Sequence, residues 1–191
     1  MKLAVATVGL LPVAAIAIAS AAIRPATAPP GDTGVVEILS GIDYIPSRGS
    51  LDDELGAGAA DKLIAIARGT AEESADAGVR IRAYRALALY PGATTEAALR
   101  ASIAEHAGGG AIDTLYLRAA AESLVQIAGA DAVDDLVPLL DHQSRDVRAS
   151  TARALGDTGS GAAVSPLRAR LSIEEVGQVR LAIAEALREL E

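Results

Sequence analysis

The residues best suited to chemistry in this chain are its two histidines, His106 and His142. Neither histidine has a second ligand at the spacing of a helical metal site or of a zinc finger. Glu105 and His106 form the only Glu-His pair in the sequence. Because a metal site needs several converging ligands, we expect no metal-binding residues.

The sequence also contains no recognisable catalytic nucleophile and no phosphate-binding loop. Ser144, Ser150 and Ser160 have no base nearby in the sequence, so we interpret them as helix caps or solvated positions. The segment "HAGGG", residues 106–110, lacks the Lys-Ser/Thr of a phosphate loop and predicts a flexible turn. Cysteine is absent, which excludes thiol chemistry and a disulfide framework. We therefore expect no catalytic residues, no cofactor-binding residues and no cofactor.

The composition favours a single helical domain. The chain has 191 residues and lacks Phe and Trp, so Ala, Leu, Ile and Val must fill its core. Alanine is the best helix former and is depleted in strands. The net charge of −8 argues against a nucleic acid partner, which requires clustered basic residues. All basic residues except Lys2 and Lys62 are arginine, which together with abundant alanine favours a bacterial source.

The amino terminus is typical of a secretory signal. Residues 1–31 contain no acid, and Lys2 precedes a long apolar run that ends in Ala19-Ser20-Ala21. We expect a signal peptide at residues 1–21 and a Pro-rich linker at residues 22–33, which places the protein in the periplasm or outside the cell. The alternative is an uncleaved anchor, because about 20 apolar residues can span a bilayer. Contact with a membrane is expected only in that case.

The dominant pattern is a helix that recurs four times. The segments are "VRIRAYRAL", "YLRAAAESL", "VRASTARAL" and "VRLAIAEAL". They end at the anchor residues Leu87, Leu124, Leu155 and Leu187, which lie 37, 31 and 32 residues apart. In each segment the anchor shares one helical face with the residues four and eight positions before it.

A second helix is predicted before each anchor segment, because an apolar pair with a spacing of four recurs there. The pairs are Leu63 and Ala67, Leu99 and Ile103, Leu136 and Leu140, and Leu167 and Leu171. Each first helix covers half of the apolar stripe beside it, and neighbouring units must cover the rest. This arrangement predicts an all-α solenoid of about four antiparallel helix pairs.

Capping signals mark the helix ends. Ser144 is the expected N-cap of the third anchor helix, and Gly156 and Gly159 are its expected stop. Ser50 and Asp53 resemble a capping box at the start of the first repeat.

The remaining boundaries are less regular. Pro138 lies inside a predicted first helix, which it should bend or loosen. We expect the repeats to occupy residues 51–191 and residues 34–50 to form an amino-terminal cap. The cap would hide the open end of the stack with its apolar residues, Val35, Val36, Ile38, Leu39, Ile42, Tyr44 and Ile45.

The segment "LLDHQSRDVRASTARALGDTG" resembles a HEAT repeat, specifically the short HEAT-like repeat also found in phycobilisome lyases. The resemblance covers about residues 52–190 and implies a right-handed stack whose second helices line a concave surface for protein partners. The sequence departs from the family at His142, where Asp is usual and Asp141 is a possible substitute. In the second unit Arg118 comes one place late, which indicates a local shift in register.

The charged residues are expected to join the repeats. One residue in each anchor helix, two positions before the anchor, forms a column of alternating charge that predicts a ladder of ion pairs. The column comprises Arg85, Glu122, Arg153 and Glu185. The arginines at a second repeated position are expected to satisfy backbone carbonyls or acids of adjacent units. They are Arg80, Arg148 and Arg180.

The first two units have longer predicted connections between their helices than the last two, by about five residues. Such insertions gather on one face of a solenoid and mark either a binding edge or tolerated surface loops.

These observations predict an exported protein-binding or scaffolding module with protein partners and no catalysis of its own. The main alternative is an enzyme or enzyme accessory of the lyase-like or metal-dependent type. It requires a ligand pocket that the sequence does not reveal. A third possibility is a purely structural envelope protein that self-associates end to end.

Overall fold

The computed structural model describes residues 34–40 and 46–191, and all regular structure within them is helical. The predicted signal peptide and the Pro-rich linker lie outside these residues. No helix in the described part of the chain is both long enough and apolar enough to cross a membrane.

Ten α-helices and five short 3₁₀ turns make up the described residues. The α-helices are α1 (Val35–Ser40), α2 (Arg48–Leu55), α3 (Ala59–Arg68), α4 (Ala77–Ala86), α5 (Ala93–His106), α6 (Ala111–Ala128), α7 (Val133–Leu136), α8 (Arg145–Asp157), α9 (Val164–Ile173) and α10 (Gly177–Leu190). The 3₁₀ turns are η1 (Glu72–Ala75), η2 (Leu87–Leu89), η3 (Gly129–Ala132), η4 (Val137–Asp141) and η5 (Gly161–Ala163).

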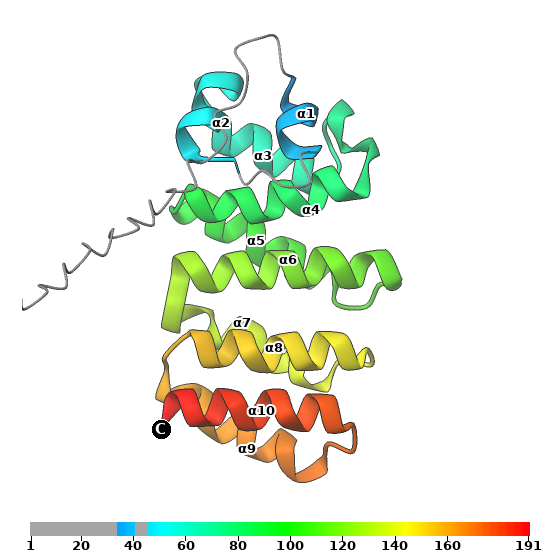
Figure 1. The fold of residues 1–191 in the computed structure, drawn as a ribbon, viewed down its shortest axis with the longest axis vertical. Helices are drawn as coiled ribbons and strands as arrows, with labels where there is room; N and C mark the ends of the chain where they lie inside the picture. The colour runs from blue at the N-terminus through cyan, green and yellow to red at the C-terminus, as the bar shows by residue number, and fades with distance from the viewer. Residues whose placement is uncertain (1–33, 41–45) are drawn as a thin grey trace, which may run out of the picture.

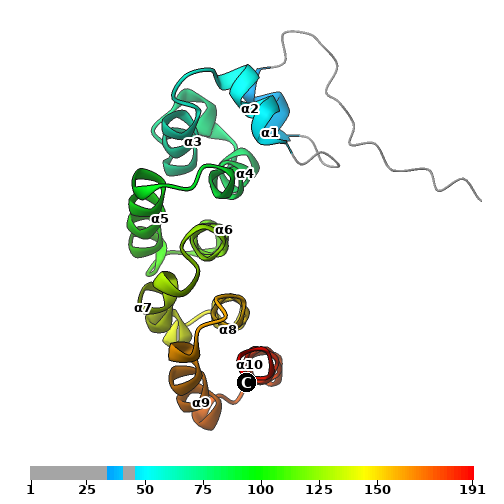
Figure 2. The same ribbon diagram turned by 90° about the vertical axis from the view of Figure 1, so that its left-hand side faces the viewer.

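The helices α3 to α10 form four antiparallel pairs stacked along one axis (Figure 1). Figure 2 shows that the stack is curved, with α3, α5, α7 and α9 in an outer row and α4, α6, α8 and α10 in an inner row on the concave side. The predicted helical repeat is therefore confirmed, including the position of the second helices.

The repeated apolar stripe forms the core. All four anchors are buried, and so are the residues eight positions earlier, Val79, Tyr116, Val147 and Val179. Tyr116 and Leu124 occupy the same positions as their counterparts in the other units, so the second unit keeps its register and the expected shift was wrong. The outer helices supply the partners, with Leu63, Leu99, Leu136 and Leu167 fully buried.

Pro138 divides the outer helix of the third unit. The α-helix α7 ends at Leu136, and the chain continues as the 3₁₀ turn η4, with the proline in its first turn. Proline lacks the N–H that an α-helix needs and its ring obstructs the preceding turn, so the tighter turn replaces the helix. The expected loosening is confirmed.

Two predicted end signals were wrong. Gly156 lies inside α8 instead of after it, and the left-handed residue past the helix is Gly159, with φ +63°. A Cβ at Gly156 would lie only 3.0 Å from Cα of Ala186, so the glycine allows α8 and α10 to pack closely. At the start of the repeats, Ser47 is the N-cap of α2, and its Oγ accepts a hydrogen bond from the backbone N–H of Ser50. The helix begins before Ser50, which leaves no capping box there.

The segment before the repeats packs against them. Ile38 and Leu39 of α1 are buried, and α1 contacts α4. The Tyr90 hydroxyl donates a 2.8 Å hydrogen bond to Asp52 of α2, and burial together with this bond raises the pKa of Tyr90 to about 12. Residues 41–45, which include three of the predicted cap residues, lie outside the described part of the chain.

Candidate functional site

The two histidines are buried and lie in different units. His106, at the end of α5, is 5% exposed, and its Nδ1 lies 2.8 Å from Oδ1 of Asp113. His142 follows η4, and its Nδ1 accepts a hydrogen bond from the backbone N–H of Ser144. Within residues 34–40 and 46–191, no group of three or more His, Cys, Asp or Glu side chains is placed to hold a metal ion.

At the position where the family usually has Asp, the Nδ1 atom of His142 accepts a hydrogen bond from the backbone N–H directly before α8. The neighbouring Asp141 makes a different contact. The Asp141 carboxylate is exposed and accepts a 2.9 Å hydrogen bond from Arg170.

The remaining candidates for chemistry are separated from one another. Glu105 is half-exposed and pairs with Arg68 at 3.6 Å. Ser144 and Ser160 occupy the N-cap positions of α8 and η5, but neither side chain makes a capping hydrogen bond. Ser150 is neither a cap nor solvated, because its buried hydroxyl donates to the carbonyls of Asp146 and Val147 in its own helix.

The repeated arginines hold the connections between the paired helices. Arg80 donates to the carbonyl of Ala67 at 3.0 Å, and Arg180 donates to the carbonyls of Leu171 and Glu174 at 2.9 Å. Carbonyls at the end of a helix lack partners within that helix, so each arginine satisfies orphaned acceptors. The prediction for these residues is confirmed.

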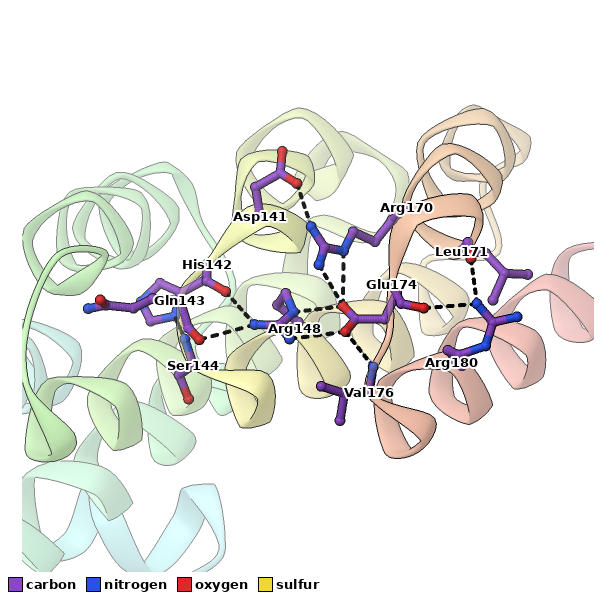
Figure 3. Close-up of polar contacts among 10 residues, drawn as sticks. All are labelled: Asp141, His142, Gln143, Ser144, Arg148, Arg170, Leu171, Glu174, Val176 and Arg180. Carbon is purple, nitrogen blue, oxygen red and sulfur yellow. Dashed lines mark hydrogen bonds and ion pairs between the residues drawn. The ribbon is translucent and has the colours of Figure 1, made fainter.

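Arg148 makes the most extensive of these contacts (Figure 3). It donates to the carbonyls of His142 and Gln143, and it forms a two-pronged ion pair with Glu174 of the next unit, at 2.8 and 3.1 Å. The paired side chains of Arg148 and Glu174 are 11% and 2% exposed. The third and fourth units are therefore joined by a buried, charged contact.

Glu174 is the centre of this cluster. It also accepts hydrogen bonds from Arg170 and from the backbone N–H of Val176. The bonds from Arg148, Val176 and Arg170 outweigh the effect of burial and lower the pKa of Glu174 to about 2. Glu174 was not predicted from the sequence. The only signal for it was Arg170 four residues earlier, which is the spacing of a helical ion pair.

Of the predicted ladder of ion pairs, only the one between the first and second units is present among the described residues. Arg85 of α4 lies 3.9 Å from Glu122 of α6, with both side chains well exposed. No ion pair within 4 Å involves Arg153 or Glu185 in the described residues. The expectation of a continuous ladder was therefore wrong.

This difference can be measured with two double-mutant cycles. We expect a coupling of about 0.2–1 kcal/mol between Arg85 and Glu122, because the pair is exposed and screened. For Arg153 and Glu185 we expect a coupling indistinguishable from zero. Urea unfolding of the alanine variants provides both values, and a larger coupling in the second cycle would contradict the arrangement described here.

The second unit replaces the repeated arginine with a histidine and an aspartate. Leu117 is fully buried at the position that arginine occupies elsewhere. Asp113 instead joins His106 to the turn, because its second oxygen accepts the backbone N–H of Gly110 at 2.9 Å. These two bonds lower the pKa of Asp113. On the other side of the ring, Nε2 of His106 lies 3.3 Å from the Tyr84 hydroxyl.

Gly109 leaves the space that this contact requires. A Cβ built on Gly109 would lie 2.3 Å from atoms of Asp113, whereas a Cβ on Gly108 meets nothing within 4 Å. We expect Gly109→Ala to lower the free energy of unfolding by about 1–3 kcal/mol, as for an overpacked core position. Gly108→Ala is the matched control and should change it little. Equal effects of the two substitutions in urea unfolding would show that Asp113 is not held as described.

The connections between the paired helices of the first and second units, both predicted to be long, differ in length and structure. The first contains η1, and Ser74 ties it to α3 by donating to the carbonyl of Ile66. The second is short, because α5 continues to His106 and α6 already begins at Ala111. The extra residues therefore lengthen the helices, and they leave Ile112 and Leu115 43% and 42% exposed on α6.

A hollow of about 560 Å³ lies between α6 and α8 in the inner row. Its lining is Arg118, Glu122, Val125 and Gln126 of α6, and Ser150, Arg153, Ala154 and Asp157 of α8. The outer sides of these two helices pack on other helices of the stack. The hollow is therefore a candidate binding site on the concave side.

Residues 113–188 match the family model described as HEAT repeats. The match extends from the first turn of α6 to the last turn of α10, so it includes both walls of the hollow and the Arg148–Glu174 contact. No curated protein shows significant similarity to the chain. The match shows that residues 113–188 are HEAT repeats, and the stacked helix pairs continue the same arrangement back to α3.

Proposed function

We propose that this chain is an exported protein-binding or scaffolding module that uses its HEAT-repeat surface and catalyses no reaction itself. HEAT repeats generally serve as protein-interaction or scaffold modules. The observation that carries the proposal is the contrast between the two kinds of polar group in the stack. The arginines between the helices of a pair, Arg80, Arg148 and Arg180, donate to backbone carbonyls of the stack, whereas Arg118 and Arg153 of the α6–α8 hollow have no such partner among the described residues.

The proposal includes no enzymatic activity because each histidine is buried, with its Nδ1 already in a contact within the stack. His106 is held between Tyr84 and Asp113, and His142 accepts the N–H of Ser144. These contacts orient the rings within the core. The right-handed winding implied by the HEAT resemblance is also part of the proposal.

The proposed location is the periplasm or the exterior of a bacterial cell, on the basis of the apolar amino terminus. Cleavage after Ala21 would give a chain that begins at Ala22 and carries a net charge of −9, because Lys2 is lost. The intact mass of the protein purified from its own cells measures this directly. An unprocessed chain recovered in the membrane fraction would instead support the anchored form.

The function is tested by recovering the chain, tagged at its carboxy terminus, from its own cells. We expect a stoichiometric complex with a protein partner. Metal content and the absorption spectrum are measured on the same sample. A chain recovered alone with a stoichiometric metal ion or a coloured ligand would contradict the binding-module proposal and favour the enzyme alternative.

A further inference from the structure

Two arginines of the α6–α8 hollow have no ionic partner. Arg118 comes from α6 and Arg153 from α8, and neither forms an ion pair within 4 Å or a hydrogen bond through its side chain with the residues that the structure describes. The arginines that join the paired helices differ from them, because Arg80, Arg148 and Arg180 all donate to backbone carbonyls.

Arg118 is the more unusual of the two. Its Nε is buried and has no hydrogen-bond acceptor among the described residues. A buried donor on a charged group is destabilising unless an acceptor is supplied, and such donors are rare in folded proteins. The Arg118 side chain therefore lines the hollow with one of its donors unsatisfied.

The acids of the hollow form no ion pair with these arginines. Glu122 is already engaged with Arg85 of α4 at 3.9 Å. Asp157 is the one lining acid without an ion pair, so the unpaired charges are two positive and one negative. With Glu122 counted, the lining carries two arginines and two acids and is neutral, in a chain with a net charge of −8.

The hollow also has apolar surface. Val125 and Ala154 belong to its lining, although they are only 7% and 4% exposed, and Leu115, one turn before Arg118 on α6, is 42% exposed. A ligand that fits this surface carries an acceptor for the arginines and apolar groups beside it.

We propose that the α6–α8 hollow binds an acidic side chain of a protein partner, with Arg118 and Arg153 donating to the carboxylate and apolar residues of the partner lying against Val125 and Leu115. A guanidinium group binds a carboxylate through two parallel hydrogen bonds, which gives both strength and orientation. The inference rests on the proposed function only in taking the source of the carboxylate to be a protein.

The test uses a short peptide as the probe. The ¹⁵N-labelled chain is titrated with the peptide acetyl-Ala-Leu-Asp-Ala-Leu-Ala-amide and with its twin in which Asn replaces Asp. The Nε–H signal of Arg118 is followed by NMR. We expect a saturable shift with the Asp peptide and binding about tenfold weaker or more with the Asn peptide, because charge-assisted hydrogen bonds are lost. Equal binding of the two peptides, or binding of neither, would overturn the proposal.

A titration with inorganic phosphate distinguishes a site for a protein side chain from a site for a small free anion. Phosphate should shift the Arg118 signal less than the Asp peptide does at equal concentration, because it makes no apolar contact. Tighter binding of phosphate than of the peptide would mean that the hollow is a small-anion site, and the proposal would then be wrong.

Three substitutions locate the binding. Arg118→Gln and Arg153→Gln should each weaken binding of the Asp peptide several-fold. Arg145→Gln, on the exposed start of α8, should leave the affinity unchanged. Arg118→Lys keeps the positive charge but lacks the planar guanidinium group, and it replaces Arg118→Gln in this test if the glutamine variant does not fold. We expect it to bind more weakly than the wild-type chain, and undiminished binding by the lysine variant would contradict the role of Arg118.

The outcomes for this inference and for the proposed function are distinct. If a protein partner recovered from cells binds Arg118→Gln and Arg153→Gln as tightly as it binds the wild-type chain, the inference fails and the proposed function stands. If the Asp peptide binds the hollow but no protein partner is recovered, the site stands and the proposed function fails.

Discussion

Replacing Glu174 with alanine is expected to lower the free energy of unfolding by about 3–5 kcal/mol, the cost of breaking a buried ion pair by removing one partner. The substitution leaves the guanidinium of Arg148 only 11% exposed and without its counter-ion. It also removes the acceptor for the backbone N–H of Val176, directly before α10. The connection between α9 and α10 should therefore loosen together with the contact between the third and fourth units.

The same contact predicts a dependence on pH. The pKa of Glu174 falls from its ordinary value of 4.5 to about 2 in the folded chain, a shift that corresponds to about 3 kcal/mol. Because the folded pKa is the lower one, the stabilisation is complete above the unfolded pKa and is lost as the pH falls from 4.5 towards 2. The free energy of unfolding of Glu174→Gln should therefore lie furthest below that of the wild type at neutral pH. This difference in free energy should become smaller as the pH falls from 4.5 towards 2.

Urea unfolding at several pH values measures both effects. Glu175→Ala is the matched control, because Glu175 is the next residue, is exposed and forms no ion pair in the described residues. It should change the free energy of unfolding by less than about 0.5 kcal/mol. A similar loss from Glu174→Ala and Glu175→Ala would show that the buried pair does not join the last two units.

Gly156→Leu is expected to disrupt the packing of α10 on α8, with a loss of about 3 kcal/mol or more. Even a Cβ at this position lies 3.0 Å from the backbone of Ala186, so a leucine side chain has no room unless the helices separate. Because contacts in a repeat stack are limited to neighbouring units, the damage should be concentrated in α8 to α10.

Hydrogen exchange followed by mass spectrometry measures this localisation. We expect faster exchange in peptides from α9 and α10 of the Gly156→Leu variant and unchanged exchange in α3 and α4. Gly161→Leu is the control, because a Cβ there meets nothing within 4 Å and the residue is exposed. Unaltered exchange in α10 of the Gly156→Leu variant would contradict the close approach of the two helices.

The periodic features of the fold could be predicted from the sequence. Burial of Leu87, Leu124, Leu155 and Leu187 follows from a stripe that recurs at helical spacing, and such a stripe has one stable environment. The carbonyl contacts of Arg80 and Arg180 also followed from a repeated position. Repetition made these assignments possible, because each unit faces the same requirement.

The features that break the repeat could not be predicted in this way. A glycine after a helical stripe usually marks the end of the helix, so the sequence pattern at Gly156 predicts a stop. Only the position of Ala186 in the next unit shows that Gly156 is a packing residue. Asp113 and His106 are seven residues apart on different helices, so their contact depends on the turn between them. The α6–α8 hollow depends on the distance between two helices, which no local pattern specifies.

The concave side as a binding surface for a protein is tested most directly by photo-cross-linking in living cells. A photoreactive residue is placed at Gln126, exposed in the lining of the hollow, or at Ala97, exposed on the outer helix α5. We predict a discrete cross-linked product with one protein at Gln126 and none at Ala97. Cross-links at Ala97 but not at Gln126 would contradict the proposed binding surface.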